Sequence, residues 1–452
     1  MKTNYFKVKQ ILIGFVLAIT GHWCYGQNIS INDVFNAGGG PDGLVKSVIE
    51  QPDGKFLIAG SFSAYNGTAV PGSLARINPD GSLDTSFTTG NIANVHGNSK
   101  LLLQPDGKII VGGIFSSFNG NFSLARIVRL NTDGSIDTSF GVSGGFDDNV
   151  RDIALQPDGK IIVVGSFDTY NGNAVPEIVR LNPDGSIDNT FAAEPNGSVF
   201  SCLLQPDGKI VISGFFTFVN GQPRANLARL NSDGSLDTSF NPDPAIAFDM
   251  VQQPDGKIVL GGIFTNIGPR IARLNIDGSV DTTFDVGTGP TGNSIVELAL
   301  QADGKILASG QFSSFNGQTV SNIVRLNPGG SIDTTFANED GLISINNTPD
   351  DILITEDFNI VLAGPFESIS GQTANYLVKL NNDIVNTVLD VEEETAYELA
   401  DGSTVVVFPQ GFTNYTVPDG VTSIEYLIVG GGGGGGHAKD RTGGGGAGGR
   451  IL

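Results

Sequence analysis

Short apolar runs alternate with small polar turns along most of this chain, and residues 100–140 show the pattern clearly. Asp-Gly and Asn-Gly pairs separate apolar and β-branched runs at Lys100–Gln104, Lys108–Phe115, Leu124–Asn131 and Ser135–Phe140. Such runs predict strands joined by hairpins, because Asp and Gly supply the backbone conformations that tight turns need. Helical periodicity is absent from these runs, so the segment is predicted to form a four-stranded antiparallel meander.

The same unit recurs seven times between about Val45 and Leu389. Six copies carry the motif Q-[PA]-D-G-K, and the divergent seventh reads T-E-D-F-N from Thr355. The starts of successive motifs are 53, 52, 49, 48, 48 and 54 residues apart. A second signature, R-[IL]-N-x-[DG]-G-S-x-D-x-[ST]-F, follows in the full copies. A fixed period in this range indicates one supersecondary unit repeated in a stack or a ring. The repeats are expected near 45–87, 98–140, 150–191, 199–240, 247–284, 295–336 and 350–389.

The two ends of the repeat region complement one another. The seventh copy lacks the G-S-x-D-x-[ST]-F strand after Asn381, whereas residues 30–35 match residues 82–87 at the Ser, aliphatic and Phe positions. The implied register places Lys379 opposite Asn32, where other copies have Arg opposite Asp. Pairing of the two ends would remove the sheet edges that an open array leaves exposed. We therefore predict an all-β fold over residues 28–390, a seven-bladed β-propeller of four-stranded antiparallel blades whose last blade is completed by the N-terminal strand at 30–35. A β-solenoid is the alternative.

A recurrent Arg and Asp are predicted to face each other across the second hairpin of each blade, where opposite charges stabilise a strand pair. The count from the turn gives the pairs Arg76 and Asp84, Arg129 and Asp137, Arg180 and Asp188, Arg229 and Asp237, Arg273 and Asp281, and Arg325 and Asp333. We interpret these charges as structural.

The chain ends differ from the repeats. Residues 1–26 combine a lysine-rich start with an apolar middle at Ile11–Ile19, which is typical of a secretory signal cleaved near Gly26. This apolar core is too short for a membrane-spanning helix. Residues 391–403 are expected to form an acidic linker, and residues 404–452 a small glycine-rich β region that is incomplete. Its G-x-G-x-x-G matches lack the βαβ context of a phosphate-binding loop.

Charge and composition narrow the function. The formal net charge of −22 argues against nucleic acid as a partner and favours solubility outside the cell. Loss of His22 with the signal leaves only His96 and His437, too few for a Ser/His/Asp triad or a multi-histidine metal site. Cys24 lacks the context of a lipidation signal, and Cys202 is predicted to be a buried free thiol.

Two sets of residues are candidates for chemistry or binding. Asn131, Asp133 and Asp137 resemble part of a calcium loop, although calcium usually needs six to eight oxygen ligands and no other cofactor is expected. Four aromatic residues, Tyr65, Phe118, Tyr170 and Phe315, are candidates for a binding face or, alternatively, plugs between blades.

The predicted topology gives the propeller two different faces. Both Asp-Gly turns of each blade lie on one face, here called the turn face. The opposite face, called the irregular face, is expected to collect the segments that vary between copies and to carry binding. These segments are residues 90–99, 141–150, 192–197, 241–247, 285–294 and 337–350.

On the D-G-K-[IFL] run, the following G-x-F and the R-L-N-x-D-G-S-x-D-x-[ST]-F signature, residues 30–382 resemble the delta-60 repeat family. The resemblance implies a β-propeller repeat of unassigned function in bacterial exported proteins, and it brings no catalytic residues. The end of the chain is similar to glycine-rich surface domains that begin F-T-V-P-x-G-V-T-S-[IL], with Tyr415 in place of the Phe.

Three functions remain open at this stage. The leading hypothesis is a non-enzymatic, monomeric module, secreted or on a bacterial cell surface, that binds or displays a glycan, protein or matrix ligand. The second is an enzyme acting on glycans or lactones through carboxylates on the irregular face, which would need two carboxylates about 5–10 Å apart. The third is a structural stalk whose glycine-rich region makes the contacts.

Overall fold

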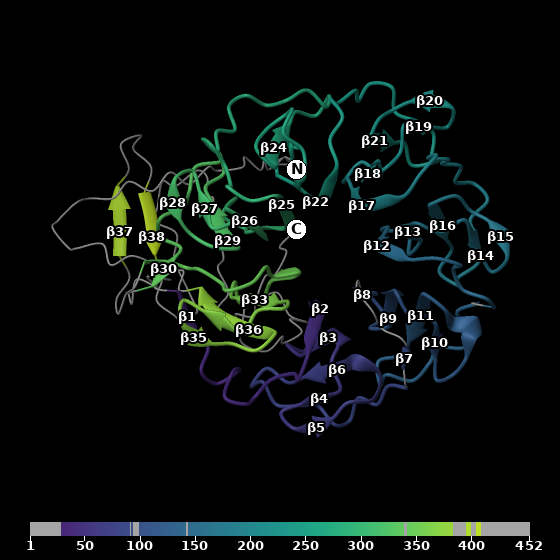
Figure 1. The fold of residues 1–452 in the computed structure, drawn as a ribbon, viewed down its shortest axis with the longest axis horizontal. Helices are drawn as coiled ribbons and strands as arrows, with labels where there is room; N and C mark the ends of the chain where they lie inside the picture. Colours follow the sequence, from purple (N-terminus) through teal and green to yellow (C-terminus); the bar gives the residue numbers. More distant parts are fainter. Residues whose placement is uncertain are drawn as a thin grey trace, which may run out of the picture.

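The computed structural model describes residues 29–90, 92–93, 99–141, 143–338, 341–382, 395–398 and 404–407 (Figure 1). The predicted signal segment, His96 and His437 lie outside these residues. The expected linker at 391–403 contains a strand, β37 (Thr395–Glu398), which pairs with β38 (Thr404–Val407). This part of the linker prediction was therefore wrong. In the part of the chain described, no helix has the length and apolar character needed to cross a bilayer.

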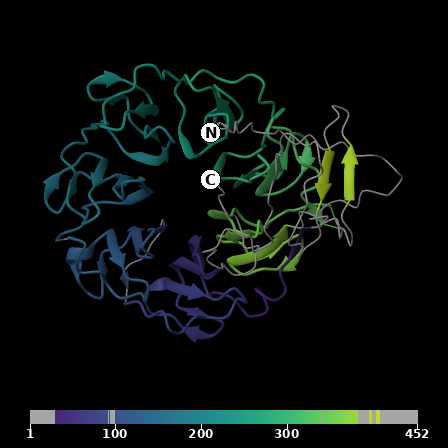
Figure 2. The same ribbon diagram turned by 180° about the vertical axis from the view of Figure 1, so that it is seen from behind.

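Seven small sheets are arranged around a common axis, as both views of the ribbon show (Figures 1 and 2). The strand nearest the axis in each sheet contacts the corresponding strands of both neighbouring sheets, so the circle is closed. These inner strands are β2 (Leu44–Glu50), β8 (Ser99–Leu103), β12 (Val150–Leu155), β17 (Val199–Leu204), β22 (Ala247–Gln252), β25 (Ser294–Leu300) and β32 (Asp351–Ile354). The all-β, seven-bladed β-propeller is confirmed, and blades 1 to 7 are numbered below in this order.

Each inner strand pairs with a middle strand, which pairs in turn with a third strand, all antiparallel. The middle strands are β3 (Phe56–Ser61), β9 (Ile109–Gly113), β13 (Ile161–Gly165), β18 (Ile210–Gly214), β23 (Ile258–Gly262), β26 (Ile306–Gln311) and β33 (Ile360–Ala363). The third strands are β6 (Leu74–Ile77), β11 (Ile127–Leu130), β16 (Ile178–Leu181), β21 (Leu227–Leu230), β24 (Ile271–Leu274), β29 (Ile323–Leu326) and β36 (Leu377–Asn382).

The predicted closure is present in blade 7. Strand β1 (Ile29–Ile31) pairs antiparallel with β36, with Ile31 opposite Leu380, and the Asn32 amide donates to the Lys379 carbonyl at 2.9 Å. Phe35 continues into the core between blades 7 and 1, where its ring meets that of Phe56 edge-on at 5.3 Å. The N-terminal segment thus supplies the fourth strand of the last blade.

In blades 1 to 6 the predicted fourth strand is reduced to a single bridging residue, which corrects the four-stranded description. In blade 2, Ile136 bridges Leu130, and the chain then turns. Asp137 causes the turn, because its Oδ1 accepts the Ser139 amide at 2.9 Å, two residues further on. The equivalent bridges are Ile77 with Leu83, Leu181 with Ile187, Leu230 with Leu236, Leu274 with Val280, and Leu326 with Ile332.

The links between blades therefore follow a different path from the one predicted. They begin beside the Asp-Gly turn of the next blade, as where the Thr88 amide donates to the Asp133 carbonyl at 3.1 Å. Each link then pairs with a short strand of that blade, as Phe146 does with Tyr170, before entering the inner strand. The variable segments thus pass along the side of the propeller and reach the irregular face only at their ends.

Short hairpins follow the middle strands and turn at Asn-Gly or Ser-Gly pairs. They are formed by β4 (Ala64–Tyr65) and β5 (Thr68–Ala69), β14 (Thr169–Tyr170) and β15 (Asn173–Ala174), β19 (Phe218–Val219) and β20 (Gln222–Pro223), β27 (Ser314–Phe315) and β28 (Gln318–Thr319), and β34 (Ser368–Ile369) and β35 (Gln372–Thr373). In blade 2, β10 (Ser117–Phe118) pairs with the link strand β7 (Ile92–Ala93) instead. Two 3-10 turns, η1 (Pro71–Ser73) and η2 (Phe122–Leu124), and the hairpin β30 (Ala337–Asn338) with β31 (Gly341–Leu342) complete the described elements.

Candidate functional site

The turn face carries a charge network built from the recurrent residues. In blade 2, Asp137 Oδ2 lies 2.8 Å from Arg129 Nε and 2.9 Å from Lys108 Nζ, while its Oδ1 accepts from the Ser139 amide and hydroxyl. Burial alone raises the pKa of Asp137, but the hydrogen bonds from Ser139, Lys108 and Arg129 outweigh it and hold the pKa well below its usual range. The Arg129 guanidinium also stacks on Phe140, 4.6 Å from the ring centroid.

All six predicted Arg–Asp pairs lie within 2.7 to 2.8 Å, each beside a lysine of the D-G-K turn. Each arginine also reaches the next blade. Arg76 donates to the Thr132 carbonyl at 2.7 Å, and Arg325 donates to the Asn382 amide oxygen at 2.8 Å in blade 7. In blade 7 itself, Lys379 pairs with Asp357 at 3.2 Å. These charges join strands within a blade and blades to one another, which is a structural role.

The oxygens considered for calcium have protein partners. Asp133 Oδ1 accepts from the Ser135 amide and hydroxyl, and Asp137 faces two cations. The Asn131 side chain donates to Ser135. Among the described residues, no group of three or more His, Cys, Asp or Glu side chains is placed to hold a metal ion. The geometry is that of a turn and an ion pair, so it gives no support to a calcium site here.

The four candidate binding-face aromatics are buried, which corrects that interpretation. Tyr65, Phe118, Tyr170 and Phe315 are each at most 2% exposed. The hydroxyls of Tyr65 and Tyr170 donate to the Gly81 and Gly185 carbonyls, at 3.1 and 2.9 Å. Burial raises the pKa of both tyrosines. These side chains fill space between the short hairpins and the blade, and no ligand can reach them.

The inner strands carry a site that the sequence interpretation missed. Five of them contain a β-bulge at the residue that lies five positions before the turn glutamine. A bulge redirects its side chain, and bulges are common beside functional sites. The residues at this position, here called the mouth ring, are Lys46, Ser99, Arg151, Phe200, Phe248, Val296 and Asp350.

Members of the mouth ring touch their neighbours in adjacent blades. Lys46 Nζ lies 2.7 Å from Asp350 Oδ2, and the Arg151 guanidinium lies 5.0 Å from the Phe200 ring centroid. The Phe200 and Phe248 centroids are 6.2 Å apart. The ring therefore has a charged pair on one side and an aromatic group on the other.

Further apolar side chains enlarge the aromatic side of the mouth ring. Phe215, which is 57% exposed, packs edge-on against Phe200 with centroids 4.8 Å apart. Ile263, at the equivalent position of blade 5, is 40% exposed. Phe200, Phe248, Phe215 and Ile263 are called the mouth patch below. Exposed apolar groups that gather in one region of a surface are typical of a binding site.

One position deeper lies a second ring, here called the acidic ring: Ser47, Lys100, Asp152, Ser201, Asp249, Glu297 and Asp351. Several of its oxygens link inner strands. Asp351 Oδ2 accepts the Val48 amide at 2.8 Å, Asp152 Oδ2 accepts the Cys202 amide at 2.9 Å, and Asp249 Oδ2 accepts the Leu298 amide at 2.8 Å. These bonds tie blade 7 to blade 1, blade 3 to blade 4, and blade 5 to blade 6.

The acidic ring holds four carboxylates and one ammonium group close enough to perturb one another. Glu297 first, and then the other three carboxylates, raise the pKa of Lys100. Burial raises the pKa of Asp249 to about 6, although Lys100 opposes the shift. Burial and then repulsion from Asp249 raise the pKa of Glu297 well above its ordinary value. Carboxyls with raised pKa values beside a cation are a combination found at functional sites.

Alignment of the repeats could have found both rings. The residues of the turn-face network repeat almost without change, but the mouth ring holds six residue types in seven blades and the acidic ring holds four. The mouth ring has no part in the repeated turns and core, whereas three carboxylates of the acidic ring also join neighbouring blades. Cys202, next to Ser201, is a free thiol as predicted, but it is partly rather than fully buried, and this burial raises its pKa.

Comparison with known families supports the fold and leaves the activity open. The model of a β-propeller domain of unknown function (DUF5122) matches residues 51–87, 104–140, 156–191, 205–240, 253–284, 301–336 and 359–383, more than half of the chain. A glycine-rich domain model matches residues 407–452. A search of curated proteins finds no match.

Solved structures resemble this one at low identity. Streptogramin B lyase is 14% identical, with a TM-score of 0.49 over 79% of this chain and 98% of that chain. Virginiamycin B lyase from Staphylococcus aureus is 16% identical, with a TM-score of 0.46 over 78% and 98%. The extracellular domain of a putative one-component system from B. thetaiotaomicron is 16% identical, with a TM-score of 0.46 over 78% of this chain but only 40% of that chain. These likenesses concern the fold alone.

Proposed function

We propose that this chain, which belongs to the DUF5122 family of β-propeller domains of unknown function, is an exported binding module that holds its ligand at the mouth ring on the irregular face. The proposal of export rests on the signal-like residues 1–26, and kinship with delta-60 repeats stays a prediction. The glycan, protein or matrix ligand of the sequence-based hypothesis contacts the propeller at the mouth patch.

One observation carries this proposal: some positions of the repeat are nearly invariant between blades, and those of the mouth ring vary. The turn-face positions that join strands and blades are nearly identical in every full copy, whereas the mouth ring holds seven side chains of six different types. The four side chains of the mouth patch, including Phe215 at 57% exposure, belong to blades 4 and 5. Exposed apolar area costs solubility and stability unless a ligand covers it.

The test is binding by the mature chain on an array of glycans and peptides, with and without calcium. A Phe215→Ser, Phe248→Ser variant should lose at least about tenfold in affinity, because burial of aromatic surface is a dominant source of binding energy. Ile276→Ser is the matched control, since Ile276 is 59% exposed in a blade 5 Asn-x-Asp-Gly turn on the turn face. Equal loss in the two variants, or no loss in the first, would contradict a site at the mouth.

A second candidate is an enzyme, and the acidic ring is the observation that favours it. Carboxyls whose pKa values are raised by burial are suited to general acid chemistry near neutral pH, and Asp249 and Glu297 are of this kind. Hydrolysis of a glycan or lactone that is lost in Glu297→Gln while ligand binding persists would establish this candidate. Binding without turnover in the unmodified chain would exclude it for the substrates tried.

A further inference from the structure

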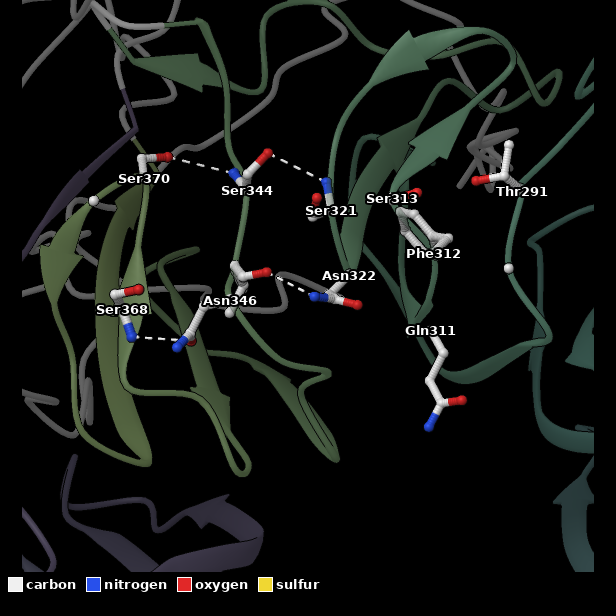
Figure 3. Close-up of a pocket in the computed structure, with 13 residues that line it drawn as sticks. Thr291, Gln311, Phe312, Ser313, Ser321, Asn322, Ser344, Asn346, Ser368 and Ser370 are labelled. Atoms are coloured by element: carbon white, nitrogen blue, oxygen red, sulfur yellow. Dashed lines mark hydrogen bonds between the residues drawn. The ribbon is translucent and has the colours of Figure 1, made fainter.

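An open groove of about 570 Å³ lies between blades 6 and 7, apart from the mouth patch on blades 4 and 5 (Figure 3). Its blade 6 side is formed by residues before β25, by the end of β26 and the residues after it, and by residues before β29. Its blade 7 side is formed by the link before β32, by β34 and by the turn that follows β34. Its inner end is Gln311, which pairs with Ser294 at the start of the inner strand β25. The groove therefore leads outward from the region of the mouth ring.

No charged side chain lines the groove, and its lining combines polar groups with apolar surface that includes Phe312 and Ile345. Hydroxyl and amide side chains dominate it: Thr291, Gln311, Ser313, Ser321, Asn322, Ser344, Asn346, Ser368 and Ser370. By contrast, the other open depression described, of about 460 Å³, is lined by Arg229, Asp255, Lys257 and Asp277 and belongs to the turn-face network.

The backbone along the groove already has its partners. The Ile345 amide donates to the Ser321 carbonyl at 3.0 Å, and the Ser370 amide donates to the Ser344 carbonyl at 2.7 Å. The Asn346 amide donates to the Ser368 carbonyl at 3.2 Å. Residues 344–346 thus lie between the two blades, hydrogen-bonded to both, with a single β-bridge from Ile345 to Ile369. An extended peptide would need a free strand edge to bind by β-augmentation, and this segment offers none.

The side chains, in contrast, keep unused hydrogen-bonding capacity. Ser344 Oγ accepts the Ser321 amide and Ser370 Oγ accepts the Ser344 amide, as Figure 3 shows. Within the described chain, the side chains of Gln311 and Ser313 and the hydroxyls of Ser321 and Ser368 have no hydrogen-bond partner. Both donors and acceptors are therefore available, spaced along the groove on a rigid support.

This chemistry selects for a ligand that is neutral and rich in hydroxyl groups. A charged ligand would lose its hydration without meeting an opposite charge, which is costly. A neutral ligand exchanges hydrogen bonds with water for bonds of similar strength, so shape and spacing decide its affinity. We propose that the groove between blades 6 and 7 is a second binding site, and that its ligand is an uncharged oligosaccharide. The proposal extends the binding role suggested above to a separate place on the propeller.

The test uses the mature chain against malto-, cello-, manno- and xylo-hexaose, with polygalacturonate, chitosan and an unrelated peptide set as charged and non-glycan probes. At least one neutral hexaose should bind, and Gln311→Trp should weaken its binding tenfold or more by filling the groove. Ser313→Glu, which introduces a charge, should act in the same direction. Both positions are exposed, so the fold is not at risk. Gln222→Trp, an exposed residue on β20 of blade 4, is the matched control and should bind normally.

The outcomes separate this proposal from the one before. Binding lost in Gln311→Trp but kept in the Phe215→Ser, Phe248→Ser variant supports the groove. Binding lost only in the mouth variant overturns the groove and leaves the binding function intact. No binding of any neutral hexaose, or binding of the charged or peptide probes alone, also overturns the proposal of a neutral oligosaccharide.

Discussion

At the scale of single residues, the recurrent aspartates of the turn face contribute to stability through several partners at once. Asp333, for example, accepts from Arg325 and Lys305 through one oxygen and from Thr335 through the other. Burial raises the pKa of Asp333, yet the bonds from Thr335 and the attraction of Arg325 leave it below its usual value. Loss of the carboxylate would leave the Arg325 guanidinium, which is only 1% exposed, with much of its charge uncompensated.

Replacement of this carboxylate should therefore be costly. We expect Asp333→Asn to lower the free energy of unfolding by about 3 kcal/mol, since removal of one partner strongly destabilises a buried ion pair. Urea denaturation followed by circular dichroism measures the change. The control is Asp303→Asn in the same blade, whose 45%-exposed side chain lies 3.7 Å from Lys305. That change should cost under about 1 kcal/mol. Similar costs for the two variants would show that the network adds little.

At the scale of elements, the closing strand is the most consequential piece of the propeller. Strand β1 offers few residues to β36, but it covers the edge of blade 7 and brings Phe35 into the core between blades 7 and 1. The Asn382 amide oxygen, next to this strand, also receives Arg325 from blade 6. Closure thus depends on side chains from both ends of the propeller.

A disulfide between strands β1 and β36 tests the closure of the propeller directly. Ser30 and Asn381 are Cα partners, and their side chains are hydrogen-bonded at 3.1 Å. Cross-strand Cα partners are about 4.5–5.5 Å apart, which suits a disulfide. Ser30→Cys with Asn381→Cys should form an intramolecular bond and stabilise the chain by about 2–4 kcal/mol, an effect abolished by dithiothreitol. The Ser30→Cys single variant is the control. A pair that stays reduced in oxidising buffer would contradict the register.

Much of this architecture could be predicted from the sequence, because the same turn motifs recur at nearly the same spacing in each repeat. The blade count, the closing strand, the register of Lys379 against Asn32, and the Arg–Asp partners all follow from turn chemistry and period. The length of the fourth strand did not follow, since the Oδ1 of Asp137 and its equivalents ends that strand with a side-chain hydrogen bond. The candidate site did not follow from the sequence pattern, because the aromatic residues beside the loops are buried, whereas the mouth ring depends on a β-bulge that no single repeat reveals.

At the scale of the whole molecule, two sets of carboxyl groups make the free energy of unfolding depend on pH in opposite directions. The turn-face aspartates, such as Asp237, have pKa values below those of the unfolded chain, so their contribution is present above about pH 4 and is lost as the pH falls. Asp249, Glu297 and Asp351 of the acidic ring behave in the opposite way, because burial raises their pKa values. Asp249 has a pKa of about 6 in the folded chain, so between about pH 4 and 6 the folded protein holds a proton that the unfolded chain releases.

Stability should therefore peak in mildly acidic solution. We expect the free energy of unfolding to fall by about 2 kcal/mol from pH 5 to 7.5, as Asp249, Glu297 and Asp351 lose protons, and to fall again below about pH 4. Thermal melts across this range measure it. Asp249→Asn should flatten the slope above pH 5, whereas Asp255→Asn, a 54%-exposed carboxylate in the same blade, should leave it unchanged. A stability that rises steadily from pH 5 to 7.5 would contradict the assignment.

The pairing of Ile29 with Asn382 has a consequence for how the propeller can be held by other parts of a protein. Segments joined before the first strand and after the last one leave from the same corner of the disc. A load applied between those two segments would act on the β1–β36 pair of blade 7, opening its hydrogen bonds one after another from the end at Ile29 and Asn382, and would leave the other six blades unloaded. A propeller attached to other domains only through these two segments would move relative to them as one rigid body.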